Sequence, residues 1–231
     1  MKPSEREDAL YSAGKTTAID QTEKILFDYM ARHSPPPGLC VDLGCGSGEI
    51  GMAVVEKGYQ YQGYDFSPVG IAKAQAKGLA AEVLDLDANG IPLTSESAAL
   101  IFASDVIEHV FDPLYLLQES CRVLKPNGVI VASMPYDANM SALRLAAGGR
   151  SNQEAVYARF GISKHHTFIS LSLIELLVTK TSGLRLLELD LIGRKSLLRR
   201  HETTVRHFTT WRVPLHIRHL SFAICIAVKK A

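Results

Sequence analysis

One short stretch of the sequence concentrates residues that could hold a polar ligand. An apolar run ends in Asp42-Leu43-Gly44-Cys45-Gly46-Ser47-Gly48. Glycines let the backbone approach a ligand closely, and buried parallel strands carry ligands at their carboxyl ends. We therefore expect Gly44, Gly46 and Gly48 to line a ligand site. Asp42 would repel a pyrophosphate there, but it would suit a ligand that carries an amine.

A second chemical pattern follows a later apolar segment. Asp105, Glu108 and His109 form D-x-x-E-H, which combines carboxylates with an imidazole that titrates near neutral pH. We predict that His109 is a general base with Glu108 beside it. The alternative is that both residues only shape the loop and cap the next helix. These oxygen donors and the imidazole could also hold a divalent cation, but no second cluster completes a coordination shell, so we do not commit to a metal site.

The frame that positions these residues alternates strands with helices. Strands are expected at 39–43, 59–64, 81–84, 99–104, 129–134, 184–191 and 220–228, with helices at about 20–33, 49–58, 68–78, 112–124 and 171–182. This alternation favours a parallel sheet covered on both faces. Ser67 and Asp112 are predicted helix caps, and Ser172 with Glu175 forms a candidate capping box. Residues 126–128 are predicted to turn the chain into the fifth strand.

Length and composition favour one domain over residues 1–231. The chain is 25.3 kDa and 47% hydrophobic, enough for a substantial core. No apolar run reaches the ~20 residues of a membrane span, and the first 15 residues lack a signal-peptide pattern. The four cysteines form no CxxC pair, so we expect reduced thiols in a cytoplasmic protein. Residues 136–167 have no clean periodicity and are predicted as a lid or inserted hairpin on the acceptor side.

Charge is unevenly distributed along the chain. Residues 194–231 hold nine basic residues and one acidic residue, a net charge of +8 against −7 for the rest. One interpretation is that 194–219 contacts an anionic surface; the other is that it neutralises the acidic part of the domain. A nucleic-acid partner is disfavoured, because Phe208 and Trp211 offer little for stacking bases.

The motifs, taken in order, resemble those of the class I S-adenosylmethionine-dependent methyltransferases. The glycine segment is similar to the family's first motif, and Gly63-Tyr64-Asp65-Phe66-Ser67 to its second. The segments 84–87, 102–110 and 124–128 resemble the next three, with Asn127 where a glycine is usual. Five motifs in order over residues 39–135 make the resemblance specific. It is closest to the small-molecule type, with some MetW-like features such as the run at 145–150.

The resemblance implies a Rossmann-like, doubly wound α/β fold of seven strands, mostly parallel with an antiparallel last strand. It also implies S-adenosyl-L-methionine as the cofactor, and the roles of individual residues follow from the matching motifs. Asp65 would accept the ribose hydroxyls, and Phe66 would pack on the adenine unless it is a plain core aromatic. Asp85 and the backbone of Leu86 would face the adenine amine, with Asp87 a rival for Asp85. Asp42 would orient the ammonium, the glycines would admit the methionine moiety, and Ser104 would contact it through its backbone.

We therefore expect a methyltransferase acting on a small-molecule or lipid- or polysaccharide-linked acceptor, at oxygen, by in-line displacement. The acceptor pocket is expected from residues 136–167, where His165 and His166 are candidate contacts. One alternative is a non-catalytic or partner-dependent MetW-like protein that binds the cofactor. Another is an NAD(P)-dependent oxidoreductase, because residues 46–51 fit GxGxxG; Asp42 disfavours it.

Overall fold

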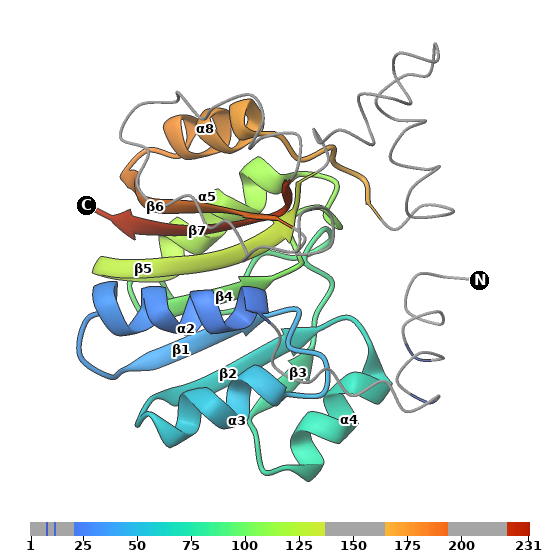
Figure 1. Ribbon diagram of the computed structural model, residues 1–231. Helices are drawn as coiled ribbons and strands as arrows, with labels where there is room; N and C mark the ends of the chain where they lie inside the picture. The colour runs from blue at the N-terminus through green and yellow to red at the C-terminus, as the bar shows by residue number, and fades with distance from the viewer. Residues whose placement is uncertain (1–7, 9–11, 13–20, 137–164, 194–220) are drawn as a thin grey trace.

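Seven strands form one sheet in the order β3-β2-β1-β4-β5-β7-β6, and helices cover both of its faces (Figure 1). This computed structural model describes residues 8, 12, 21–136, 165–193 and 221–231. The strands are β1 Leu39–Leu43, β2 Gln60–Asp65, β3 Ala81–Val83, β4 Ala98–Ser104, β5 Leu124–Pro135, β6 Leu184–Gly193 and β7 Ser221–Lys230. The helices are α2 Gln21–His33, α3 Glu49–Glu56, α4 Pro68–Ala76, α5 Pro113–Val123 and α8 Leu171–Lys180.

The strand directions confirm the predicted fold class. Neighbouring strands from β3 to β5 pair in parallel, whereas β7 runs antiparallel to both β5 and β6. A dinucleotide-binding sheet has the order 3-2-1-4-5-6 without such an inserted strand. The result is the doubly wound, Rossmann-like α/β sheet with an antiparallel last strand.

The side chains of the central strand β4 divide the core into two apolar layers. Leu100 and Phe102 pack with residues of α2, α3 and α4 on one face. Ile101 and Ala103 pack with residues of α5 and α8 on the other. All four are buried, because a strand covered on both faces must be apolar at successive positions. The carboxyl ends of the parallel strands are thereby held at one edge of the sheet.

Helix ends follow the predicted capping chemistry at two of three places. The Ser67 hydroxyl accepts a hydrogen bond from the Gly70 amide at 3.0 Å, and the Asp112 carboxylate accepts one from Tyr115 at 2.9 Å. The capping box predicted at Ser172 is wrong. The N-cap of α8 is Ser170, which accepts from the Leu173 amide.

The turn predicted at residues 126–128 is built into a strand. β5 begins at Leu124, and its pairing with β4 shifts register between Ala98 and Leu100. Asn127 has a φ of 65°, a conformation that asparagine tolerates better than most residues. The chain therefore turns through an irregularity of the sheet, which sequence spacing alone does not distinguish from a free loop.

Apart from the start of β5, the boundaries of the described helices and strands lie within two residues of those predicted. The predicted lid at 136–167 is described only at Tyr136 and 165–167, and the basic segment 194–219 lies outside the described residues. Cys40, Cys45, Cys121 and Cys225 are all buried and none forms a disulfide. No described helix is long and apolar enough to cross a bilayer.

A buried carboxylate fastens α2 to the sheet. Glu188 of β6 is 6% exposed and accepts hydrogen bonds from Arg32 and His33 in the last turn of α2. Burial raises the pKa of Glu188, but the bonds from His33 and Arg32 outweigh it and hold the pKa below its usual range. The ionised carboxylate therefore stabilises the fold above the pKa of the unfolded chain.

We expect Glu188→Ala to lower the free energy of unfolding by about 2–3 kcal/mol, because it leaves the side chains of Arg32 and His33 without their buried partner. Asp28→Ala is the matched control: Asp28 pairs with the same Arg32 but is half exposed, so it should cost at most about 0.5 kcal/mol. Urea unfolding curves measure both. The Glu188 effect should shrink as the pH falls below about 4.5, and equal losses in the two variants would contradict this account.

Candidate active site

The predicted site residues meet at the carboxyl edge of the parallel strands. The glycine loop follows β1, Asp65 ends β2, Asp85 and Leu86 follow β3, and Ser104 ends β4. Strands β1 to β5 run in the same direction, so these ends lie beside one another. In such sheets this edge is the usual position of a ligand.

Asp65 organises the glycine loop. One carboxylate oxygen accepts the Gly46 amide at 2.9 Å, and the other accepts the Ser67 amide at 2.8 Å. The loop is also tied to β2 by the Gly44 and Cys45 amides, which both donate to the Tyr64 carbonyl. Asp65 is 7% exposed, so its carboxylate is buried beside the loop that it holds.

Asp42 is a buried acid with one hydrogen-bonded carboxylate oxygen. The Tyr61 hydroxyl donates to its Oδ2 at 2.8 Å, and no described group bonds to its Oδ1. Burial raises the pKa of Asp42 to about 7; the Tyr61 hydrogen bond opposes that rise, and the charges of Asp65, Glu23 and Glu49 add to it. An orphaned, buried carboxylate oxygen beside a glycine loop is suited to a cationic ligand group.

An exposed aromatic ring follows β2, and a small turn follows β3. Phe66 is 38% exposed, so a plain core role for it is wrong. Asp85 Oδ1 accepts from the Asp87 and Ala88 amides, while Leu86 is half-buried against the core. Asp87 accepts the Phe111 amide at 2.7 Å, so it links two loops of this edge.

The loop after β4 packs directly on the glycine loop. Gly44 has a φ of 70°, and a Cβ there would lie 2.5 Å from Cγ2 of Val106. The Ser104 and Ser133 hydroxyls are 2.9 Å apart across β4 and β5, and Ser133 donates to Asp105. The D-x-x-E-H segment and the glycine loop are therefore packed against each other at Val106 and Gly44.

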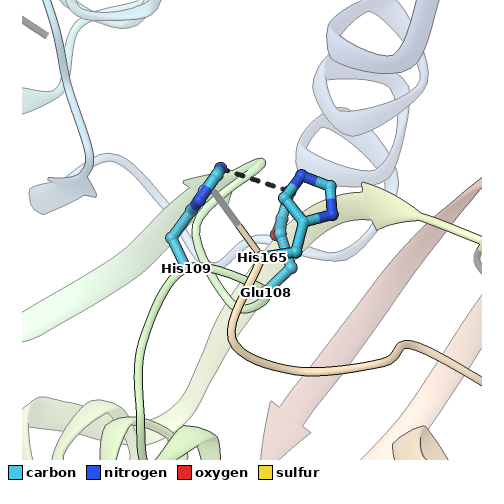
Figure 2. A group of neighbouring side chains, drawn as sticks. All are labelled: Glu108, His109 and His165. Carbon is cyan, nitrogen blue, oxygen red and sulfur yellow. Dashed lines mark ion pairs between the residues drawn. The ribbon is translucent and has the colours of Figure 1, made fainter. Parts of the chain in front are cut away.

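Glu108, His109 and His165 come together at this edge (Figure 2). One potential ligand atom from each lies within 4.8 Å of the others. Glu108 Oε1 is 3.8 Å from His109 Nε2, and the two imidazole rings meet edge to face with centroids 4.9 Å apart. Glu108 and His165 are buried, at 1% and 8% exposed, whereas the His109 side chain is 39% exposed.

Backbone hydrogen bonds hold His165 in place. The His166 and Thr167 amides both donate to the carbonyl of Glu108, at 2.8 and 3.2 Å. The His166 ring stacks on Phe111 with centroids 4.0 Å apart. The histidine pair that sequence analysis set in the acceptor region thus divides: His165 joins the acid and His109, and His166 lies outside.

Sequence reasoning overlooked Tyr61 and Ser133. Tyr61 lies in a short strand with no motif of its own, and only the pairing of β1 with β2 brings its hydroxyl to Asp42. Ser133 lies within an apolar strand, where a polar residue is the one available signal. The partnership of His165 with Glu108 could not be predicted, because 56 residues of chain separate them.

Comparison with known proteins agrees with this geometry. Residues 41–132 match the family described as "Methyltransferase domain". A ubiquinone biosynthesis O-methyltransferase of Cereibacter sphaeroides is 31% identical over 97 residues, covering 40% of this chain and 39% of that protein. An uncharacterized methyltransferase of Mycobacterium bovis is 32% identical over 123 residues, covering 52% and 48%. The chain thus spans half or less of the length of the curated relatives it matches.

Solved structures share the fold over nearly the whole chain. An S-adenosylmethionine-dependent methyltransferase from Mesorhizobium loti superposes with a TM-score of 0.65 at 19% identity, covering 90% of this chain and 97% of its own. A putative sarcosine dimethylglycine methyltransferase from Galdieria sulphuraria gives the same TM-score and identity, with 98% of each chain covered. At this identity the likeness concerns the fold.

Proposed function

Because this chain carries a class I S-adenosylmethionine-dependent methyltransferase domain, we propose that it transfers a methyl group from that cofactor to the oxygen of a small-molecule or lipid-linked acceptor. The observation that carries the proposal is the glycine loop joined to Asp65 and bordered by the Asp42 carboxylate. This combination provides one carboxylate for a ribose and another for an ammonium beside the same loop. We place the reaction in the cytoplasm, where the four buried thiols stay reduced.

The residues suit the donor at each of its parts. The Asp65 carboxylate would accept the two ribose hydroxyls, and the exposed ring of Phe66 would cover one face of the adenine. The turn at Asp85 and Leu86 would face the adenine amine. Asp42 would hold the ammonium, and Ser104 would contact the methionine moiety through its backbone.

Methyl transfer from a sulfonium is an in-line displacement, so holding donor and acceptor in line supplies most of the catalysis. The acceptor oxygen bonds to the methyl carbon as the carbon–sulfur bond breaks, and that bond's electrons become a lone pair of the neutral thioether product. The acceptor's proton must leave, and we assign its uptake to the partly exposed imidazole of His109. Glu108 beside it stabilises the imidazolium that forms.

The proposal is tested by calorimetric titration of the full chain with S-adenosylhomocysteine, with NAD as the control. Micromolar binding of the first and none of the second is expected. Acceptors are then screened with quinols, lipid-linked sugars and small phenols by product formation. Binding of NAD alone would overturn the proposal. Cofactor binding without turnover on any acceptor would favour the partner-dependent alternative; a structural neighbour from Haloferax volcanii was itself solved in complex with a methyltransferase activator.

Removing the proposed base separates binding from chemistry. We expect His109→Ala to lower kcat by about 10²–10⁴-fold, the usual contribution of a general base, and to change the Kd for S-adenosylhomocysteine less than threefold. Steady-state kinetics on the identified acceptor and calorimetry measure the two quantities. His33→Ala is the control for the general effect of removing a histidine, because His33 is bonded to Glu188 on β6. Undiminished kcat in His109→Ala would remove this assignment.

The raised pKa of Asp42 predicts a pH-dependent cofactor affinity. The carboxylate is ionised only above its pKa of about 7, so binding of the ammonium should strengthen as the pH rises through that value. We expect the Kd for S-adenosylhomocysteine to be about tenfold weaker near pH 6 than near pH 8.

Two variants check the sign of this dependence. Tyr61→Phe removes a bond to the ionised form, so it should raise the pKa of Asp42 and move the curve to higher pH. Asp42→Asn should flatten the curve at weak affinity. A steep profile that survives Asp42→Asn would assign the pH dependence to another group.

A further inference from the structure

We infer that Glu108, His109 and His165 form a binding site for one divalent transition-metal ion of the zinc type. In the part of the chain that the structure describes, this is the one group of three histidine, cysteine or carboxylate donors close enough to share an ion. The site itself is independent of the cofactor. Only its consequence for catalysis rests on the proposed function.

The donor types select the ion. Two imidazole nitrogens and one carboxylate oxygen form a set that suits Zn²⁺, Co²⁺ or Fe²⁺, whereas Mg²⁺ and Ca²⁺ prefer oxygen donors alone. Three protein ligands also leave a coordination position for water or a substrate oxygen. This composition is that of catalytic zinc sites rather than of closed structural ones.

The spacing needs only a small adjustment to hold the ion. Ligands at about 2.1 Å from a tetrahedral zinc lie roughly 3.4 Å from one another. The donor atoms here are within 4.8 Å, and the Glu108–His109 pair is at 3.8 Å. The side chain of His109 is exposed, so it can rotate and bring its ring nitrogen closer to the other two donor atoms. Figure 2 shows Glu108 and His109 on one chain segment beside His165 on another.

The surroundings are rigid where a metal site requires it. The carbonyl of Glu108 accepts hydrogen bonds from the amides of the two residues after His165, so the two chain segments that carry the ligands are fixed relative to each other before an ion arrives. Val106, Ile107 and Val110 anchor the loop in the core. Because Glu108 is 1% exposed, its carboxylate is surrounded by a low dielectric, where a divalent charge is attracted strongly.

An ion here would change how the acceptor proton is lost. Its charge would lower the pKa of a coordinated hydroxyl, as zinc does for water, and the proton would pass to solvent. The imidazole of His109 would then be a ligand, and its role as base would belong to the ion-free protein. The cation site would therefore define how the acceptor is activated in the proposed reaction.

The test is metal binding by the full chain after chelator treatment and dialysis. We expect Zn²⁺ calorimetry to give one equivalent at micromolar or lower Kd, and Co²⁺ to give the visible bands of a low-coordinate nitrogen–oxygen site. Glu108→Gln, His109→Ala and His165→Ala should each weaken Zn²⁺ binding at least tenfold. His166→Ala is the matched control. His166 follows His165 in the chain but stacks on Phe111 outside the cluster, so this variant should keep the wild-type affinity.

Four further histidines lie in residues 194–220, so the variants decide where the ion binds. Equal affinity in the wild type and all three cluster variants, or no binding, overturns the site. His109→Ala changes an exposed side chain, which keeps the test valid if Glu108→Gln does not fold. Titration with S-adenosylhomocysteine in parallel separates the two proposals: cofactor binding without zinc binding refutes the metal site alone, and zinc binding without cofactor binding refutes the proposed function alone.

Discussion

Replacing Asp65 with alanine is expected to weaken the binding of S-adenosylhomocysteine at least a hundredfold. The carboxylate would lose its charge-assisted hydrogen bonds to two ribose hydroxyls, worth about 1.5–3 kcal/mol each. It also holds the Gly46 amide at 2.9 Å, so the loop that receives the methionine moiety would lose an anchor. A loss of ~3 kcal/mol already corresponds to a hundredfold.

A matched pair of variants isolates this contribution. Asp65→Asn keeps the size of the side chain but turns an N–H toward one of the two backbone donors, at Gly46 or Ser67. It should therefore resemble alanine in affinity. Glu82→Gln removes an exposed acid from the neighbouring strand β3 and should change the Kd less than twofold. Calorimetry measures all three, with circular dichroism as the check on folding. A folded Asp65→Ala that binds within threefold of the wild type would refute the ribose assignment.

Gly48→Ala should have the largest effect on stability. Gly48 has a φ of 85°, and a Cβ there would lie 2.4 Å from Cδ1 of Leu79, 3.1 Å from Cβ of Ala74 and 3.4 Å from its Cα. Leu79 can rotate away, but Ala74 cannot. Left-handed strain of about 1–2 kcal/mol adds to overpacking of about 1–3 kcal/mol, so we expect a loss of about 2–5 kcal/mol in the free energy of unfolding.

Gly78→Ala supplies the control with the same backbone strain. Its φ is 82°, and nothing lies within 4 Å of an added Cβ, so it should cost only about 1–2 kcal/mol. Urea unfolding of both variants separates strain from packing. Gly48→Ala should also reduce affinity for S-adenosylhomocysteine, because the amides at the start of α3 shift, whereas Gly78→Ala should not. Equal costs in the two variants would mean that α4 yields to the added methyl.

Local patterns in the sequence were sufficient for most of the frame. Apolar runs bounded by turn residues located all seven strands, and Ser67 and Asp112 marked two helix starts. The chemistry of capping and of left-handed glycines acts over a few residues, so it can be predicted from neighbours alone. The bulge at Asn127 was missed because a bulge is defined by the pairing of β5 with β4, which lies elsewhere in the sequence.

In the candidate site, too, some features could be predicted from the local sequence and others depend on tertiary contacts. Asp42, Asp65 and the glycines could be assigned to one edge from their spacing, since each follows a strand of a parallel sheet. The Tyr61 hydroxyl on Asp42 depends on the register of β1 against β2. The contact of Val106 with Gly44 depends on how two loops pack.

By itself, the sequence determined the fold class, the order of the elements along the chain and the residue types at each strand end, because these follow from periodicity and short-range backbone chemistry. Only the tertiary structure decided that β7 inserts between β5 and β6, that burial raises the pKa of Asp42 and that His165 joins Glu108 and His109. Those properties depend on which distant segments exclude water from one another, and the long-range packing of the two core layers sets that arrangement.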